Sequence, residues 1–261
     1  MDRYQNRRVL ITGAGSGIGR ATVLRILAEG GRVVAVDVDE AGLKATYERA
    51  VTAGGTASDV TGRLTTAFLD VSDERSVTAG VAEAVDTLGG LDVLVNAAGI
   101  LRSEHTHRTT LDLFNRVVAV NLTGTFLMIR EAVPALLAGD RPVIVNFSST
   151  SAAFAHPYMS AYAASKGGIQ AMTHAIASEY SRQGLRAVCV APGSIASGMT
   201  TGSGPGLPDD ADMSLFTKLV PAIGQGFAGP ETVAGVVAML GSEDGAFITG
   251  TEIRVDGGTH F

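Results

Sequence analysis

The sequence predicts an α/β fold: one doubly wound sheet of seven parallel strands, flanked by helices on both faces. Short apolar runs recur along the 261 residues, and an amphipathic segment follows nearly every one. Most runs are continuous rather than alternating, which indicates strands that are buried on both faces. Strand–helix alternation of this kind is typical of a single parallel sheet that helices cover on both sides.

The predicted elements follow one another in a regular order. Strands are expected at residues 9–11, 33–36, 64–69, 91–95, 143–147, 185–190 and 252–255. Helices are expected between them, at about 18–29, 40–53, 73–88, 111–137, 160–182 and 230–240. Local signals agree, because Asp73 can cap a helix, Gly30-Gly31 can end the first helix and Pro230 fits a first helical turn.

The composition is that of a globular protein and excludes several classes of function. Hydrophobic residues make up 46% of the chain and charged residues 18%, which argues against disorder. A net charge of −6 provides no basic surface for a nucleic-acid partner. The single cysteine, Cys189, excludes an intramolecular disulfide and a multi-cysteine zinc site, and its apolar neighbours predict an inert thiol in a buried strand.

We expect one domain over residues 1–261, because no repeat or change of composition marks a second one. An irregular region at about 194–228, rich in Gly and Pro, is predicted to form a substrate loop. The N-terminus lacks the pattern of a signal peptide, and Ser, Gly and Pro interrupt the two uncharged stretches at 142–165 and 187–208. These features predict a cytoplasmic protein without a membrane partner.

A glycine-rich stretch at residues 12–19 joins the first predicted strand to the first predicted helix. Glycines allow a sharp turn and a close approach of the main chain to a ligand, and the helix N-terminus offers free N–H groups. At a strand-to-helix junction this pattern predicts a site for the pyrophosphate of a dinucleotide. The residues assigned to it are Gly13, Ser16, Gly17, Ile18 and Gly19.

Asp37 ends the second predicted strand, 18 residues after Gly19. A carboxylate there can accept hydrogen bonds from both ribose hydroxyls and would repel a 2′-phosphate. Neither Ser16 nor Val38 is basic, and Arg20 is expected to be a solvated or capping charge. The pattern therefore predicts NAD as the cofactor rather than NADP, although a simple turn role for Asp37 remains open.

Tyr162 and Lys166 are four residues apart on a predicted helix, so both side chains lie on one face. A free tyrosine has a pKa of about 10, and a neighbouring cation stabilises the phenolate and lowers that value. Such a pair can act as a general acid or base towards an alcohol or carbonyl oxygen. The strand before this helix ends in Asn146-Phe147-Ser148-Ser149, which strengthens the interpretation.

With these motifs the chain resembles the short-chain dehydrogenase/reductase family. The resemblance extends from residue 9 to residue 258 and rests on the glycine-rich stretch, Asn96-Ala97-Ala98-Gly99, Asn121, Ser149, Tyr162 with Lys166, and Pro192-Gly193. It implies a seven-stranded Rossmann-type fold, NAD(P) dependence and hydride transfer to or from an alcohol or carbonyl carbon.

The resemblance also implies roles for four catalytic residues. Tyr162 would be the acid/base, and Lys166 would lower its pKa and hold the nicotinamide ribose. Ser149 would orient the substrate oxygen, with the adjacent Ser148 as the alternative. Asn121 would hold a water between Lys166 and solvent, unless it is a helix-interior residue that the backbone satisfies.

Further cofactor contacts follow from the same resemblance. Asp70 and Val71 would meet the adenine, although Asp70 also fits a loop position near a helix cap. Residues Asn96, Ala97, Ala98 and Gly99 would line the adenosine side, and many relatives carry a second Asn where Ala97 stands. The nicotinamide would contact Pro192, Gly193, Ile195 and Ser197, the last at a position where relatives often have Thr.

Other polar residues of the sequence receive no firm role. His105 and His107 are expected to be solvated loop residues, because no third ligand for a metal is apparent. His156 and Tyr158 either face the substrate or pack in their loop, and both alternatives stay open. Tyr158 is a poor candidate for the acid, because no lysine lies four residues further on.

The sequence therefore predicts an NAD-dependent oxidoreductase that transfers a hydride between the nicotinamide and a secondary alcohol or ketone carbon of a small-molecule substrate. The runner-up is a 3-oxoacyl-(acyl-carrier-protein) reductase-like enzyme with Arg102 and Arg130 as docking charges, and a catalytically silent NAD sensor is the alternative from another class. The resemblance also implies a homotetramer. Small residues on the helix that bears Tyr162 suit close helix packing, although they also suit packing on the sheet.

Overall fold

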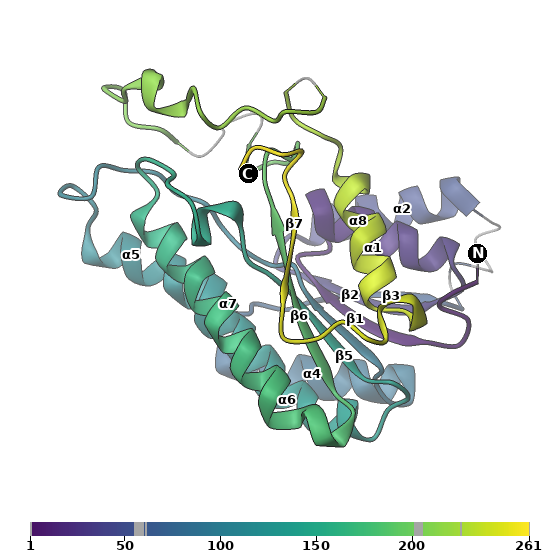
Figure 1. The fold of residues 1–261 in the computed structure, drawn as a ribbon. Coiled ribbons are helices and arrows are strands. Elements are labelled where there is room, and N and C mark those ends of the chain that lie inside the picture. Colours follow the sequence, from purple (N-terminus) through teal and green to yellow (C-terminus); the bar gives the residue numbers. More distant parts are fainter. Residues whose placement is uncertain (1, 55–59, 61, 201–205, 225, 261) are drawn as a thin grey trace.

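Seven parallel strands form one sheet, as predicted, and their order is β3-β2-β1-β4-β5-β6-β7 (Figure 1). The computed structural model describes residues 2–54, 60, 62–200, 206–224 and 226–260. The strand order reverses between β1 and β4, which makes the carboxyl ends of these strands the expected ligand crevice. The strands are β1 (Arg8–Thr12), β2 (Arg32–Asp37), β3 (Leu64–Phe68), β4 (Val93–Asn96), β5 (Val143–Phe147), β6 (Arg186–Pro192) and β7 (Glu252–Val255).

Helices cover both faces of the sheet, again as predicted (Figure 1). One layer holds α1 (Gly17–Ala28), α2 (Glu40–Gly54) and α8 (Pro230–Leu240). The opposite layer holds α4 (Glu74–Leu88), α6 (Gly124–Leu137) and α7 (Ser160–Tyr180), with α5 (Leu111–Val118) packed against α7.

Neighbouring residues of a central strand supply the two layers. In β1, Ile11 packs into the α1 and α8 layer, whereas Leu10 packs into the α4 and α6 layer, and both are fully buried. All five residues of β5 are buried, while the edge strands β3 and β7 are partly exposed. Burial on both faces explains why the central strands are continuous apolar runs.

The local signals at the helix ends are confirmed. The Asp73 side chain accepts a hydrogen bond from the Arg75 N–H at the start of α4. Pro230 occupies the first turn of α8, and Gly30 takes a φ of 91° just beyond the end of α1. Residues 55–59 and 61, between α2 and β3, lie outside the described residues.

The helix predicted at 111–137 is not one continuous α-helix. Residues Ala119–Thr123 (η1) are π-helical and separate α5 from α6. A π-helical turn accommodates an extra residue, and such turns are frequent at functional sites. The whole stretch is the one helix of the described residues that has the length and hydropathy of a membrane span, but 56% of its most apolar window is buried inside this fold.

The loop after β6 is closed at its base. Ile195 and Ala228 form an isolated parallel bridge, the Ala196 N–H donates to Ala228 O at 2.8 Å, and the Ala228 N–H donates to Ser194 O at 2.9 Å. Its described part contains a short 3₁₀ helix, η4 (Met213–Phe216).

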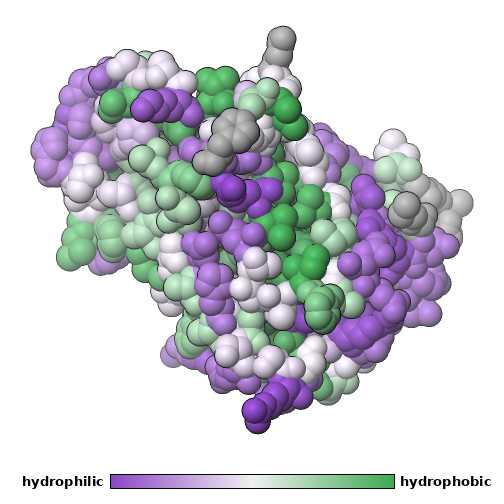
Figure 2. All heavy atoms as spheres, in the orientation of Figure 1, coloured by the Kyte–Doolittle hydropathy of each residue, from purple (hydrophilic) through white to green (hydrophobic). Residues whose placement is uncertain are grey.

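The molecular face in Figure 2 is apolar or pale through its middle, over β7 and α8, and hydrophilic along its edges. Phe247, in the turn before β7, is fully exposed. Within the described residues β7 pairs only with β6, so its outer edge is open. This face therefore combines an unpaired strand edge with exposed apolar area.

Candidate active site

The predicted site residues gather at the carboxyl ends of the central strands. The glycine-rich stretch follows β1, β4 ends at Asn96, and β6 ends at Pro192. Ser149 comes two residues after β5. In doubly wound sheets, ligands bind at this edge, beside the reversal of strand order.

Tyr162 and Lys166 lie one turn apart on α7. The Lys166 Nζ atom lies 5.6 Å from the centre of the Tyr162 ring and donates a hydrogen bond to Phe147 O at 2.8 Å. The Ser149 hydroxyl is hydrogen-bonded to Tyr162. A phenol, a hydroxyl and an ammonium are thus brought together at the end of β5.

The structure distinguishes Ser149 from its neighbour Ser148. The Ser149 hydroxyl accepts a hydrogen bond from the Ser151 N–H at 3.2 Å, at the start of the 3₁₀ helix η2 (Thr150–Ala152). Ser148 points elsewhere, because its hydroxyl donates to the Glu252 carboxylate. Ser149 is therefore the hydroxyl beside Tyr162, as the sequence spacing predicts.

Burial is the main influence on both ionisable groups. It raises the pKa of the Tyr162 hydroxyl, and the hydrogen bond with Ser149 opposes that rise by stabilising the phenolate. Burial also lowers the pKa of Lys166 to about 8. The expectation that Lys166 lowers the Tyr162 pKa is thus incomplete, because Ser149 is the group that counters burial.

Asn121 is fully buried in the π-helical turn η1. Its Nδ2 donates to Ile100 O and to Ser165 Oγ, both at 3.0 Å, and its Oδ1 accepts from the Ile100 N–H at 2.8 Å. A Cβ built on Gly99 would lie 3.3 Å from this Oδ1 and 3.5 Å from Lys166 Nζ. The side chain is satisfied locally, yet it lies beside the lysine, and its water-holding role stays a prediction.

The glycine-rich stretch has no room for side chains at two positions. A Cβ on Gly13, which has a φ of 67°, would lie 2.7 Å from the backbone of Ala97, and a Cβ on Gly19 would lie 2.0 Å from Gly13 O. Ser16 precedes α1 without a side-chain cap, and the first turn carries no acidic residue. Uncapped N–H groups at a bare turn fit a pyrophosphate.

Asp37 is fixed beside this stretch. Its Oδ2 accepts from the Gly15 N–H at 2.9 Å, and its Oδ1 accepts from the Asp39 N–H at 3.0 Å. Arg20 is occupied elsewhere, because its guanidinium donates to Gly15 O and to the Thr46 hydroxyl. The carboxylate thus lies where a ribose-binding acid is expected, and the nearby cation is bonded to the α1–α2 framework.

Asn96, predicted to line the cofactor, lies in a buried polar chain. Only 3% exposed, it donates from Nδ2 to Asn146 Oδ1 at 2.9 Å, and Asn146 donates to the Thr173 hydroxyl at 2.9 Å. The Cys189 thiol joins the chain at 3.1 Å from Thr173, and burial raises its pKa to about 11. The inert core cysteine is confirmed, whereas a cofactor contact of Asn96 stays a prediction.

The two residues predicted to meet the adenine also have structural partners. Asp70 Oδ1 accepts from the Ser72 N–H at 2.8 Å and from the Ser72 hydroxyl at 2.6 Å, which agrees with the loop alternative. Val71 is buried, and a Cβ on Gly124 would lie 2.9 Å from it. The adenine contacts of Asp70 and Val71 stay predictions.

The residues predicted on the nicotinamide side face the glycine-rich stretch. A Cβ on Gly17 would lie 3.3 Å from the Ser197 Cβ. Gly193 packs closely on the end of β7, since a Cβ there would lie 2.6 Å from the Asp256 Cβ. Ile195 is buried and its carbonyl accepts a hydrogen bond from Thr200 at 2.6 Å. The loops after β1 and β6 therefore lie against each other at Gly17 and Ser197, and the nicotinamide contacts of the second loop stay a prediction.

His156 and Tyr158 lie in the loop between Ser149 and Tyr162. His156 pairs with the Thr150 hydroxyl at 3.3 Å, and burial, with His260 as a second cause, lowers its pKa to about 4. The Tyr158 hydroxyl accepts a hydrogen bond from the Asp212 N–H at 2.8 Å. Sequence reasoning missed this link to the loop after β6, because nothing in the sequence marks Asp212.

Among the residues described, no group of three His, Cys, Asp or Glu side chains is arranged to hold a metal ion. His107 is exposed and His105 half-buried, and their ring centres are 5.5 Å apart. His105 bonds instead to Asp210, at 3.0 Å. His107 is exposed as expected for a solvated loop residue, whereas the half-buried His105 pairs with a residue of a distant loop.

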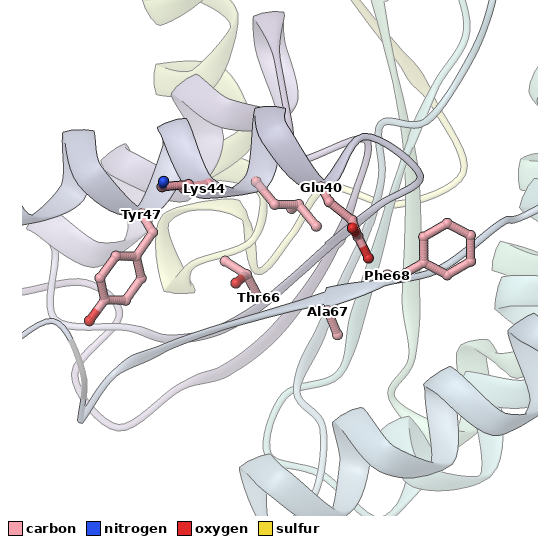
Figure 3. A pocket seen from close by; sticks show the side chains of 7 residues that line it. Glu40, Lys44, Tyr47, Thr66, Ala67 and Phe68 are labelled. Carbon is pink, nitrogen blue, oxygen red and sulfur yellow. The ribbon is translucent and has the colours of Figure 1, made fainter.

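Two hollows on the surface lie away from the catalytic residues. One groove of about 450 Å³ runs between α2 and the edge strand β3, lined among others by Glu40, Lys44 and Phe68 (Figure 3). A second, of similar volume, lies near Arg7 and Arg141, before β1 and β5. Neither contains a residue that the sequence assigns to catalysis.

Comparison with known proteins identifies the family of the chain. A family model described as Enoyl-(Acyl carrier protein) reductase matches residues 13–260. The chain belongs to the short-chain dehydrogenase/reductase family. It is therefore an enzyme, an oxidoreductase of the kind that acts on secondary alcohols or ketones with a nicotinamide nucleotide.

Three relatives illustrate the likeness. A 2-(S)-hydroxypropyl-CoM dehydrogenase of Xanthobacter autotrophicus is 35% identical, with 98% of both chains covered. A 3-ketoacyl-(acyl-carrier-protein) reductase of Brucella melitensis, complexed with NADH, is 30% identical over 98% of this chain and 99% of that one, with a TM-score of 0.85. A short chain dehydrogenase of Burkholderia cenocepacia, in complex with NADP, is 29% identical over 98% and 99%, with a TM-score of 0.84.

Proposed function

We propose that this oxidoreductase uses NAD and that Tyr162 moves the proton while the hydride moves between the nicotinamide and a secondary alcohol or ketone carbon. The observation that carries the proposal is the joint position of Tyr162, Ser149 and Lys166 at the end of β5. When bound, the nicotinamide nucleotide supplies or takes up the hydride.

Tyr162 is the group that donates a proton to the ketone oxygen during reduction and accepts it back during oxidation. The Ser149 hydroxyl, held by the Ser151 N–H, donates a hydrogen bond to the same oxygen and orients it. Positioned acid–base help of this kind is typically worth about 10²- to 10⁴-fold in rate.

Lys166 supplies positive charge beside the phenol. When Tyr162 gives up its proton, the ammonium stabilises the phenolate, and Phe147 O holds the lysine in place. Asn121, bonded to Ile100 and Ser165, keeps the π-helical turn against this group and leaves its Oδ1 beside the ammonium.

Asp37 supports NAD over NADP. A 2′-phosphate on the adenosine ribose would meet its carboxylate, and Arg20 is already bonded to Gly15 O and Thr46. The residues that would hold the nucleotide are Gly13, Ser16, Gly17, Ile18 and Gly19 at the pyrophosphate, Asp37 at the ribose, Asp70, Val71 and Asn96–Gly99 at the adenosine, and Tyr162, Lys166, Pro192, Gly193, Ile195 and Ser197 at the nicotinamide.

A small alcohol or ketone is the preferred substrate class. The runner-up, a 3-oxoacyl group on a carrier protein, needs free basic residues for docking. Arg130 is paired with Glu74 and Glu131, both at 2.8 Å, which leaves Arg102 as the other exposed candidate. Together with a net charge of −6, this arrangement favours the small substrate.

We also propose that the chain is one domain, cytoplasmic, and assembles as a homotetramer. The exposed Phe247 near the open edge of β7, and the exposed Leu111 and Phe126 on the α5–α6 stretch, are apolar surfaces that self-association would cover. Light scattering tests the assembly, since a mass near four times 26.7 kDa supports it and the mass of a single chain contradicts it.

The experiment for the reaction is a panel of secondary alcohols with NAD or NADP, and of ketones with NADH or NADPH, followed by nucleotide absorbance. We expect turnover with a preference for NAD(H) of roughly tenfold or more, from the repulsion between Asp37 and a 2′-phosphate. A preference for NADPH contradicts the cofactor assignment. Silence across the panel despite tight NAD binding contradicts the proposed chemistry.

A further inference from the structure

Tyr158, four residues before Tyr162, has a strained backbone. Its φ is 65°, in the left-handed region that bulky side chains rarely adopt. Such a conformation persists when the surrounding structure holds it firmly, and it is found most often at functional positions. The contacts of Tyr158 show what holds it.

Tyr158 joins three segments that are far apart in the sequence. Its carbonyl accepts a hydrogen bond from the Glu104 N–H at 2.9 Å, in the loop after β4. Its ring meets the His105 ring edge-on at 4.9 Å and stacks on Phe216 at 6.1 Å. Its hydroxyl accepts from the Asp212 N–H at 2.8 Å. Both the loop after β4 and the loop after β6 are therefore bonded to one residue of the catalytic segment.

Asp210 makes a second connection between the same two loops. Its carboxylate accepts hydrogen bonds from Arg108 and, at 3.0 Å, from His105 Nε2. The neighbouring Asp209 has no ion pair among the residues the structure describes, although it carries the same charge one position away. Asp210 and Tyr158 thus attach residues 207–216 at two points to the loop after β4 and to the catalytic segment.

Residues 207–216, which these contacts hold, lie near the catalytic end of α7. The segment lies above the N-terminal end of α7, where Tyr162 is located (Figure 1). It follows Pro192–Ser197, the predicted nicotinamide side, along the chain. A change in the position of this segment would therefore alter the surroundings of the end of α7 that carries Tyr162.

We propose that Tyr158 and Asp210 form a latch that keeps residues 207–216 closed beside Tyr162 and so controls substrate binding. In this proposal Tyr158 positions residues 207–216 and does not take part in the chemistry. The nature of the substrate, an alcohol or ketone, rests on the proposed function. Opening the latch lowers the fraction of enzyme that is competent to bind substrate, and the apparent affinity falls by that fraction.

The first test follows the segment directly. Lys218, an exposed residue just beyond it, is a trypsin site whose cleavage rate reports the open population when opening is fast. Tyr158→Phe removes one hydrogen-bond acceptor, and Asp210→Asn removes the charge that pairs with Arg108. The loss of one hydrogen bond raises the ratio of the open to the closed form by about 2- to 10-fold. With both forms populated in the wild type, each variant should raise the rate of cleavage after Lys218, identified by mass spectrometry, by about 1.5- to 3-fold.

Matched controls carry the same chemical changes elsewhere. Tyr180→Phe lies at the far end of α7, and Asp209→Asn lies beside Asp210. Both should be cleaved at the wild-type rate, and Asp210→Glu should restore most of the protection. Melting temperatures within about 2 °C of the wild type for all variants exclude general destabilisation, since a 1 kcal/mol loss of stability lowers Tm by about 2–4 °C in a chain of roughly this size.

The second test uses ethyl acetoacetate as the ketone probe with NADH. Tyr158→Phe and Asp210→Asn should raise KM by about 1.5- to 3-fold and leave kcat within twofold, because the fold-changes in KM and in cleavage rate multiply to the fold-change in the open-to-closed ratio. General destabilisation does not give this split. Wild-type cleavage after Lys218 in both variants overturns the latch, and faster cleavage with an unchanged KM overturns its role in substrate binding. Failure of the proposed function is seen separately, as activity in Tyr162→Phe, and leaves the cleavage result unaffected.

Discussion

The Lys166 Nζ atom lies 5.6 Å from the centre of the Tyr162 ring; Lys166 is buried and Tyr162 half-buried, one turn apart on α7. Burial moves their pKa values in opposite directions, upward for the phenol and downward, to about 8, for the amine. Each shift disfavours the charged form. Burying these two groups therefore lowers the free energy of unfolding by an amount that depends on pH.

Replacing Lys166 by Met should reveal this cost. Because the amine loses its proton near pH 8 in the folded protein but only near 10.5 when unfolded, its burial penalty is full below pH 8 and is relieved as pH rises to 10.5. The free energy of unfolding of the wild type, minus that of Lys166→Met, should therefore rise by about 3 kcal/mol across this window. Urea titrations of both proteins at about pH 7.5 and about pH 10.5 measure this change in the difference of unfolding free energies.

Lys44→Met is the matched control, because Lys44 is exposed on α2. The difference in unfolding free energy between wild type and this variant should stay nearly constant over the same range. A constant difference for Lys166→Met as well would contradict a lowered pKa for Lys166.

Gly19→Ala should disturb the nucleotide site far more than another helical glycine does. The new Cβ would lie 2.0 Å from Gly13 O, so the turn must shift, at a cost of about 1–3 kcal/mol in stability. Gly167→Ala, whose Cβ would meet only Ala152 O at 3.9 Å, should stabilise α7 by about 0.5–1 kcal/mol. Thermal unfolding and NADH titration of both variants measure the contrast, and equal NADH affinity in the two would argue against the glycine turn as the cradle.

Asp37→Ser should shift the cofactor preference. Removing the carboxylate removes its repulsion of a 2′-phosphate and its hydrogen bonds to the ribose. We expect kcat/KM with NADPH relative to NADH to rise by about 10- to 100-fold, as for a change of 1.4–2.8 kcal/mol. An unchanged ratio would show that Asp37 does not face the ribose. Asp73→Ser, which alters a helix cap on α4, controls for loss of a surface carboxylate.

His156 should make the protein less stable in mild acid. Burial lowers its pKa from 6.5 to about 4, so the unfolded chain binds the extra proton first, and stability falls as pH drops from 6.5 towards 4. The groups around it are the Thr150 hydroxyl and His260. Between pH 7 and pH 4.5 the free energy of unfolding should fall by about 1–3 kcal/mol less in His156→Asn than in the wild type, as measured by urea unfolding. Parallel losses in the two proteins would contradict the lowered pKa.

The sequence was most informative where one local signal decided the structure. The apolar runs predicted all seven strands, and for β5, β7 and α8 the predicted bounds agree with those observed. The i,i+4 spacing placed Tyr162 and Lys166 on one face of α7, and a positive φ or a blocked Cβ explains why Gly13 and Gly19 stand where they do.

Features that depend on contacts between distant segments were not predictable in this way. The π-helical turn at Ala119–Thr123 leaves the apolar pattern of a long helix intact, so periodicity reads it as continuous. The inward turn of Asn96 depends on Asn146 across the strand pair. The contact of Asp212 with Tyr158 joins residues that are 54 positions apart. Periodicity and local motifs depend only on residues that are close in the sequence, so they cannot predict contacts between distant segments.

The most direct test of the central claim is the turnover of Tyr162→Phe, which removes the phenolic hydroxyl and keeps the ring beside Lys166. We expect kcat to fall by about 10²- to 10⁴-fold or more, because the proton donor is lost, while the Kd for NADH changes by less than about threefold. A kcat within tenfold of the wild type, at unchanged NADH affinity, would contradict the assignment of Tyr162 as the acid/base.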